Sequence, residues 1–374
     1  SIDQEVNVKE KEKLKEVENE SNTAEEELEI NQKNQKIHKK YRFANIGNNC
    51  YLNSSLQLLT RISDLTKNVF NFDIHQIKED NATNGQLIKT FKNILTQIEE
   101  AIDDDHLIIN PRKFKETMGK VDGRYLKINQ EDANEFISNF IDALLWETGD
   151  KGKLEKIKKL NLINEMDKKA YGNFEKKFYK RRGYSFILDL FYGIIRTQKY
   201  CKHCDNHDNN NIISIKYNAY NMLELPIFDL AEYNKNKSLE FDKIFDLYKS
   251  DKKIESVCKN CNRDNEVYTK TSIYTFPKYL MISFGRSVDE VYINNNIIYP
   301  KELILESDYD KSKHSFILES VIEHTGGVNS GHYTCLCSMD TKNSIWFRFS
   351  DSNCDESIND FHSKYAIILL YKSV

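Results

Sequence analysis

Cys50 is the residue of this sequence best placed for nucleophilic chemistry. It lies in the stretch NIGNNCYLNSSLQLL, where a turn rich in glycine and asparagine gives way to an apolar run with helical spacing. A cysteine at a helix N-terminus faces unpaired backbone N–H groups and the positive end of the helix dipole, which lower a thiol pKa and favour the thiolate. Taken alone, the pattern also fits an inert buried thiol, because free cysteine is among the most buried residue types.

His332 is the residue best placed to act as a base for that nucleophile. It follows the stretch HTGGVNS and opens the alternating segment HYTCLC, so we expect it at the mouth of a strand. Cys50 and His332 lie far apart in the sequence, as in cysteine proteases whose partners meet only in the fold. In WFRFSDSNCDE, Ser350 and Asp351 offer acceptors for the imidazole. Taken one at a time, His332 also fits an ordinary surface or core histidine whose ring nitrogens have hydrogen-bond partners. Ser350 and Asp351 also fit an ordinary polar turn after a strand.

Two Cys-x-x-Cys pairs, Cys201/Cys204 and Cys258/Cys261, predict a metal site. Four thiolates complete the tetrahedral shell of a structural zinc ion, with one pair expected from each of two β-hairpins. The gap between the pairs exceeds that of common zinc ribbons, so the chain between them must form strands of its own. A redox dithiol is the alternative, but no βαβ pattern surrounds either pair.

The composition narrows the class of protein. The 374 residues are 39% hydrophobic, with a formal charge of −4, which gives no drive toward nucleic acid or an anionic membrane. Neither a membrane span nor a signal peptide is visible. Eight cysteines are too few for a secreted disulfide scaffold. We therefore expect an intracellular protein, cytoplasmic or nuclear, with no membrane or nucleic-acid partner.

The chain changes character along its length. Residues 1–40 carry no aromatic residue and many acids and lysines, which predicts a disordered tail. Helical periodicity runs from Cys50 to about Trp146. Residues 151–182 are a basic insertion that fits either a solvated lobe edge or a patch for an acidic partner or nucleic acid. From Tyr184 onward, short β-branched and aromatic runs predict strands, so the fold class is α+β.

Together these motifs resemble the ubiquitin-specific protease family of papain-like deubiquitinating cysteine peptidases, over the chain from about Phe43 to Tyr371. NIGNNCYLNSSLQLL is similar to that family's cysteine box, HTGG and GHY to its histidine box, QEDANEF to an internal motif and YAIILLY to its closing strand. Within the cysteine box, Ile46, Asn49 and Leu52 depart from the family pattern Asn-Leu-Gly-Asn-Thr-Cys-Tyr-Met-Asn-Ser.

The resemblance implies a papain-like α+β fold for a catalytic domain over residues 41–374. It would comprise a helical thumb (about 41–182, including the 151–182 insertion), zinc-tipped antiparallel β fingers (about 183–282) and a β-rich palm (about 283–374).

The resemblance also implies roles for the candidate residues. Cys50 would attack the carbonyl of ubiquitin's C-terminal glycine, and His332 would take the thiol proton. The side chain of Asn45 and the Cys50 backbone N–H would stabilise the oxyanion, and water would hydrolyse the thioester. Ser350 stands where the family usually has Asp or Asn, so we expect Ser350 to orient His332, with Asp351 in support.

The motif QEDANEF is expected to contact the substrate. By the resemblance, Gln130, Asp132 and Glu135 would bind the basic C-terminal tail of ubiquitin, with carboxylates accepting from its arginines. The alternative is a pair of solvated helix charges.

The implied partners are ubiquitin and ubiquitinated proteins, and the need for an activating protein partner stays open. The implied cofactor is structural zinc, with no catalytic metal or organic cofactor. A protease of another ubiquitin-like modifier and a non-catalytic ubiquitin-binding module are the alternative functions.

Overall fold

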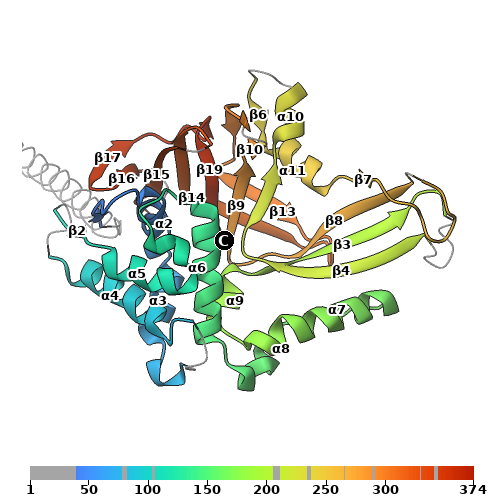
Figure 1. Cartoon of the computed structure of the whole chain (residues 1–374), viewed down its shortest axis with the longest axis horizontal. Helices are drawn as coiled ribbons and strands as arrows, with labels where there is room; N and C mark the ends of the chain where they lie inside the picture. Colours follow the sequence, from blue (N-terminus) through green and yellow to red (C-terminus); the bar gives the residue numbers. More distant parts are fainter. Residues whose placement is uncertain are drawn as a thin grey trace, which may run out of the picture.

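The structure is a computed structural model in which a helical lobe, a large sheet and a long narrow sheet lie side by side (Figure 1). Helices dominate before Gly193 and strands after it, which confirms the α+β prediction. The predicted tail lies outside the described residues, apart from its last two positions. The described residues are 39–77, 82–102, 106–204, 211–233, 237–264, 266–288, 291–328, 330–340 and 344–374.

The thumb consists of helices packed around one core. α2 is buried along its whole length, because thumb helices pack on one side of it and the palm sheet on the other. The rings of Phe91, Phe114 and Phe140 meet at centroid distances of 5.0 to 6.0 Å. The thumb elements are β1 (Arg42–Phe43), α2 (Cys50–Thr60), α3 (Ser63–Asn71), η1 (Ile74–Gln76), α4 (Gln86–Glu100), β2 (Ile108–Ile109), α5 (Arg112–Val121), η2 (Gly123–Leu126) and α6 (Ala133–Thr148).

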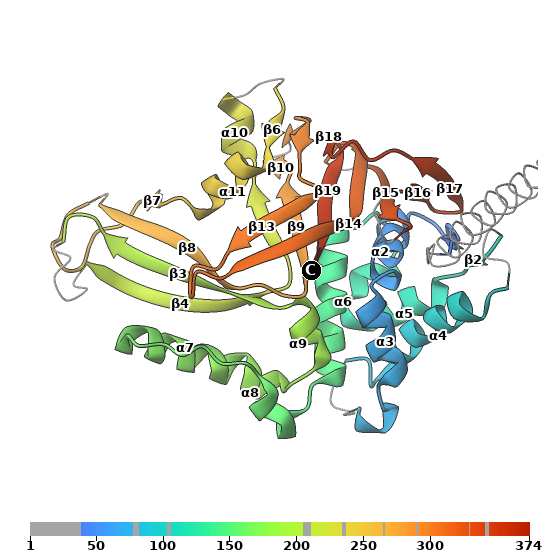
Figure 2. The ribbon, with the colours of Figure 1, turned by 180° about the vertical axis from the view of Figure 1, so that it is seen from behind.

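The palm is an eight-stranded sheet in the order β17-β16-β15-β14-β19-β9-β5, with β13 paired to β14. Along β15, Cys335 and Cys337 join the core shared with α2, and Leu336 joins the core on the opposite face. Because both faces are covered, β15 is held firmly against α2 (Figure 1, Figure 2). The strands are β5 (Leu223–Pro226), β9 (Tyr279–Gly285), β13 (Glu302–Glu306), β14 (Lys313–Gly326), β15 (Gly331–Ser338), β16 (Trp346–Ser350), β17 (Asn353–Ser357) and β19 (Ala366–Ser373).

The fingers are a four-stranded antiparallel sheet in the order β4-β3-β8-β7, which extends away from the thumb (Figure 2). Its strands are β3 (Gly193–Cys201), β4 (Ile212–Tyr220), β7 (Lys252–Ile254) and β8 (Val267–Thr275). Within the range predicted for the fingers, β5, α10 (Phe228–Tyr233) and α11 (Phe241–Lys249) instead share the second core of the palm.

The basic insertion has one packed face. It forms η3 (Lys151–Lys156), α7 (Glu165–Lys177) and α8 (Tyr179–Arg182), and α7 lies along β4 (Figure 1). Phe174 and Tyr171 are buried with Tyr217 of the fingers. Asp167 accepts from Arg196 and from the Tyr217 hydroxyl, both at 2.6 Å. This segment is therefore a packed part of the fold that connects the thumb to the fingers.

The remaining elements are short. They are α9 (Phe186–Phe191), β6 (Leu239–Glu240), β10 (Ser287–Val288), β11 (Val291–Tyr292), β12 (Ile297–Ile298) and β18 (His362–Ser363). Among the residues that the structure describes, no helix has the length and apolar character needed to span a bilayer.

Candidate functional site

Cys50 is the first residue of α2, as the turn residues before it predict, and is only 3% exposed. Burial raises the pKa of its thiol above the ordinary value. The backbone N–H groups of Tyr333 and Tyr51 oppose this rise in pKa, and Asp351 adds to it. The expectation of a lowered thiol pKa is therefore wrong for this structure, because burial outweighs the helix end. A base is needed to remove the thiol proton.

His332 lies at the start of β15, one residue before Tyr333, whose backbone N–H faces the Cys50 sulfur. The pairing of β14 with β15 sets Thr325 opposite His332. The Nε2 atom of His332 lies 2.8 Å from the hydroxyl oxygen of Ser350 at the end of β16. The fold thus brings Cys50, His332 and Ser350 to one junction between thumb and palm.

Asp351 follows Ser350 in a left-handed backbone conformation, with φ of 49°. Its two carboxylate oxygens accept from the side-chain amides of Asn45 at 2.8 Å and Asn53 at 2.7 Å. Its carboxylate therefore ties the palm to the turn before Cys50, whereas the sequence predicted support for His332.

The turn before Cys50 is held by its own polar groups. The side-chain oxygen of Asn45 accepts from the Gly47 N–H at 2.9 Å. Gly47 and Asn48 both have positive φ, of 104° and 45°, which glycine and asparagine adopt more readily than other residues. This local chemistry explains why NIGNN precedes the helix.

Gln130 joins the loop before α6 to the strand that carries His332. Its amide nitrogen donates to the Gly331 carbonyl at 2.7 Å, and its amide oxygen accepts from the Gly331 N–H at 3.1 Å. Asp132 caps α6 by accepting from the N–H groups of Asn134 and Glu135. Glu135 also pairs with Arg124 at 2.7 Å. Gln130 is thus close to the catalytic candidates, whereas the two acids are engaged at the start of α6.

Sequence reasoning missed Asn49 and Asn53, which are buried at 0% and 2% exposure. Their hydrogen bonds join the turn before Cys50 to Asp351. The available signal was two asparagines four residues apart at the start of a helix with an apolar stripe, since buried amides need partners. His324 was also missed. It is buried beside Tyr333, with ring centroids 4.4 Å apart, and burial lowers its pKa.

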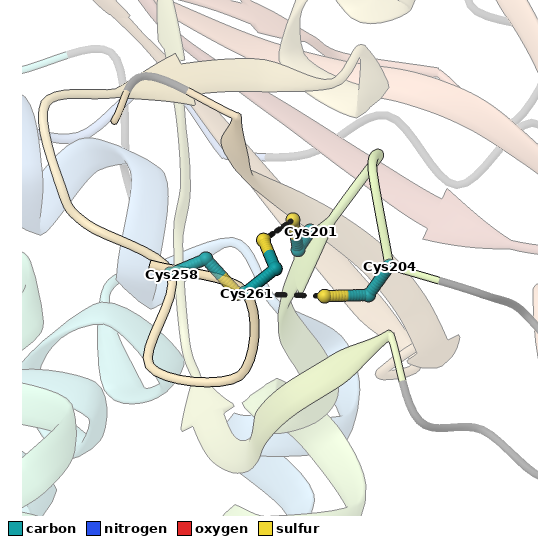
Figure 3. Close-up of side chains that lie close together, drawn as sticks. All are labelled: Cys201, Cys204, Cys258 and Cys261. Carbon is teal, nitrogen blue, oxygen red and sulfur yellow. Dashed lines mark hydrogen bonds between the residues drawn. The ribbon is translucent and has the colours of Figure 1, made fainter. Parts of the chain in front are cut away.

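The four cysteines of the fingers form one cluster (Figure 3). Their sulfur atoms all lie within 4.8 Å of one another, with 3.8 Å between Cys201 and Cys261 and 3.6 Å between Cys204 and Cys258. Backbone N–H groups of Cys261 and Asn260 lower the pKa of the Cys258 thiol. Four converging sulfurs suit a tetrahedral metal ion.

Comparisons with known proteins agree with this arrangement. The sequence model of the family described as ubiquitin carboxyl-terminal hydrolase matches residues 41–371. Ubiquitin carboxyl-terminal hydrolase Usp2 of Drosophila melanogaster is 24% identical over 344 residues, which cover 88% of this chain and 34% of that protein. Ubiquitin carboxyl-terminal hydrolase 21 of Homo sapiens is 24% identical over 354 residues, which cover 88% of this chain and 60% of that protein. The chain thus spans one to two thirds of these relatives.

Solved structures share the fold. A structure of yeast SAGA DUBm with an Sgf73 mutant has a TM-score of 0.65 at 16% identity, covering 91% of this chain and 70% of that one. A SAGA DUB module of Ubp8, Sgf11, Sus1 and Sgf73 bound to monoubiquitin has a TM-score of 0.64 at 15% identity. This match covers 95% of this chain and 75% of that one. These likenesses establish the papain-like arrangement of thumb, fingers and palm.

Proposed function

The chain belongs to the ubiquitin carboxyl-terminal hydrolase family, and from that premise we propose that it is a cysteine-type deubiquitinase. It cleaves the isopeptide or peptide bond after the C-terminal glycine of ubiquitin. The observation that carries the proposal is the junction of three elements. Cys50 opens α2, the Tyr333 N–H of β15 faces its sulfur, and the adjacent His332 is held by Ser350 of β16 at 2.8 Å.

The proposed chemistry begins with proton transfer. The hydroxyl of Ser350 is hydrogen-bonded to Nε2 of His332, which leaves Nδ1 of the same ring to take the thiol proton from Cys50. The sulfur then attacks the glycine carbonyl, forming a carbon–sulfur bond and an oxyanion. Collapse of this intermediate breaks the carbon–nitrogen bond, and His332 returns the proton to the leaving amine. Attack by water on the thioester releases the ubiquitin carboxylate and restores the thiol.

Asn45 supplies an oxyanion donor in this scheme. A primary amide has two N–H donors. One of them goes to Asp351 at 2.8 Å, which fixes the amide and leaves the second N–H for the developing negative charge. The Cys50 backbone N–H is the second proposed donor. Asp351 therefore acts on the oxyanion side of the site in this proposal, while Ser350 acts on the imidazole side.

The substrate is proposed to be ubiquitin, which the solved neighbour carries as monoubiquitin. Asp132 uses one carboxylate oxygen to cap α6 and keeps the other for an arginine of the ubiquitin tail. Glu135 would exchange Arg124 for such an arginine. The solved neighbour is a module of Ubp8 with Sgf11, Sus1 and Sgf73, and this assembly supports an activating protein partner. An intracellular location, cytoplasmic or nuclear, belongs to the same proposal, because eight cysteines are too few for a secreted disulfide scaffold and four of them form Cys-x-x-Cys pairs typical of metal sites.

The four-cysteine cluster is proposed to bind structural zinc. Cys201 and Cys204 would supply one pair of thiolates, and Cys258 and Cys261 the other. When bound, zinc would cross-link the two finger loops. Metal analysis of the purified chain tests this directly, and one zinc ion per chain is expected.

The experiment that tests the function uses ubiquitin carrying an electrophile at its C-terminus. We expect covalent labelling of the full chain and its loss in Cys50→Ala. Labelling by the probe of another ubiquitin-like modifier in preference to ubiquitin would favour a different protease. Binding of ubiquitin without any labelling would favour a non-catalytic module. Either result would refute the proposal.

A further inference from the structure

Asn49, the residue before Cys50, does not cap helix α2 with its side chain. Asparagine is among the most favoured residues at a helix N-cap, where its side chain accepts from the second or third N–H of the helix. Asn49 is the N-cap of α2, yet among the described residues its side chain makes no such bond. Instead it points back into the preceding turn, so the first N–H groups of α2 stay available to an anion at Cys50.

The Asn49 side chain binds the backbone of that turn. Its oxygen accepts from the Ile46 N–H at 2.8 Å, and its nitrogen donates to the Ala44 carbonyl at 3.3 Å. The same nitrogen donates to the side-chain oxygen of Asn53 at 3.0 Å. Asn49 therefore uses its amide to hold the turn that carries Asn45.

Asn53 carries the connection from α2 to the palm. Its nitrogen donates to the Ala44 carbonyl at 3.2 Å and to Asp351 at 2.7 Å. Asp351 in turn accepts from Asn45 at 2.8 Å. An unbroken series of hydrogen bonds thus runs from the N-cap of the nucleophile helix to the proposed oxyanion donor. We call these four residues, Asn49, Asn53, Asp351 and Asn45, the amide relay.

The relay has a single satisfied arrangement. Turning the Asn53 amide over would set its oxygen against the Asp351 carboxylate and its nitrogen against the Asn49 nitrogen. A buried amide without partners is unfavourable, and Asn53 is 2% exposed. The orientation of the Asn53 amide, and with it the direction of its hydrogen bond with Asn49, is therefore set by the negative charge of Asp351.

We propose that Asn49 and Asn53 are positioning residues for the proposed reaction. Through Asp351 and the Ala44 carbonyl, they hold the Asn45 amide so that its free N–H faces the acyl oxygen of the substrate. This inference rests on the proposed function. In the resembling family's cysteine box the position of Asn49 is threonine, whose single hydroxyl cannot bond Ile46, Ala44 and Asn53 together. The Asn49 link is thus a feature of this chain.

The test measures kcat and KM of the full chain on ubiquitin with a fluorogenic amide at its C-terminus. Asn53→Ala and Asn49→Ala are expected to lower kcat by about tenfold or more, bounded by the 10²–10³-fold loss seen when an oxyanion donor is removed. KM should change little, because Asn49 and Asn53 are buried and do not themselves reach the substrate. Asn49→Thr should retain more activity than Asn49→Ala, since its hydroxyl can still accept from Ile46.

Gln57 provides the matched control. It is a buried amide in the same helix, 2% exposed, and bonds the Tyr41 carbonyl at 2.9 Å and Arg61 at 3.0 Å. Gln57→Ala removes a buried amide without touching the relay. It should lower the melting temperature at least as much as Asn53→Ala, while keeping kcat near the wild-type value. This comparison separates a positioning role from loss of stability.

A double variant supplies the decisive readout. If Asn53 acts through Asn45, then Asn45→Ala combined with Asn53→Ala should lose no more kcat than Asn45→Ala alone. Multiplied losses, or wild-type kcat in both Asn49→Ala and Asn53→Ala, would overturn the inference while leaving the proposed function intact. If the wild-type chain itself showed no turnover, the proposed function would fail and the inference with it.

Discussion

Substitution of Asp351 best distinguishes an effect on the proposed oxyanion donor Asn45 from an effect on the imidazole of His332. Asp351→Ala deletes a carboxylate that accepts from Asn45 at 2.8 Å and from Asn53 at 2.7 Å. Hydrogen bonds to charged groups each contribute about 1.5–3 kcal/mol. Without them, the Asn45 amide loses the partner that fixes its orientation, and the second N–H no longer faces the oxyanion.

The expected magnitude follows from the donor that is lost. Removing one oxyanion donor raises the barrier by about 2.7–4 kcal/mol, which corresponds to about 10²–10³ in kcat. We expect Asp351→Ala to approach this range, with KM nearly unchanged. Asp351→Asn can accept from only one of the two asparagines at full strength, so an intermediate loss is expected.

The assay is turnover of a fluorogenic ubiquitin C-terminal amide as a function of pH. Asp355, on the exposed side of the following strand β17, provides a control as Asp355→Ala, which should retain wild-type kcat. An action through Asn45 lowers kcat at every pH without moving the profile. A shifted profile after Asp351→Ala would mean that the carboxylate acts on His332, as the sequence suggested. A kcat within about threefold of wild type, under 1 kcal/mol, would refute the positioning role altogether.

Four further predictions test separate parts of the account. Ser350→Ala removes one neutral hydrogen bond to His332, about 0.5–1.5 kcal/mol, so kcat should fall about two- to thirteenfold; a complete loss would contradict a merely orienting role. Gln130→Ala removes both bonds to Gly331 and should lower kcat about tenfold at an unchanged melting temperature, checked by kinetics and calorimetry; a change in KM alone would instead favour tail binding. Because burial raises the pKa of the Cys50 thiol, its alkylation by iodoacetamide should increase with an inflection at a higher pH than that of an unperturbed cysteine; an inflection at lower pH than the unperturbed one would indicate a preformed thiolate. Cys261→Ser should release zinc and lower the melting temperature, measured by metal analysis and calorimetry, whereas full zinc retention would exclude Cys261 as a ligand.

The elements of the fold were predictable because their signals are local. Turn residues before an apolar helical period placed the start of a helix at Cys50, and the structure confirms it. The two Cys-x-x-Cys pairs predicted a four-sulfur cluster, which the structure contains. Short runs of β-branched and aromatic residues predicted the sheets after Tyr184. Each of these patterns depends on neighbours in the sequence.

The properties that were not predictable arise from contacts between distant segments. Burial at the junction of α2 and β15 raises the pKa of the Cys50 thiol, and no local pattern reveals that burial. The partners of Asp351 lie roughly 300 positions away, on α2 and the turn before it. The apolar face of α7 was hidden by the lysines around Tyr171 and Phe174, which reach β4 only in the fold.

The central claim is that the sulfur at position 50 is the atom that bonds to the ubiquitin C-terminus. Its most direct test is peptide mapping by mass spectrometry after reaction of the full chain with a ubiquitin C-terminal electrophile. We predict a single adduct on Cys50, formed much more slowly in His332→Ala. An adduct on any of the other seven cysteines, or the same rate without His332, would contradict the claim.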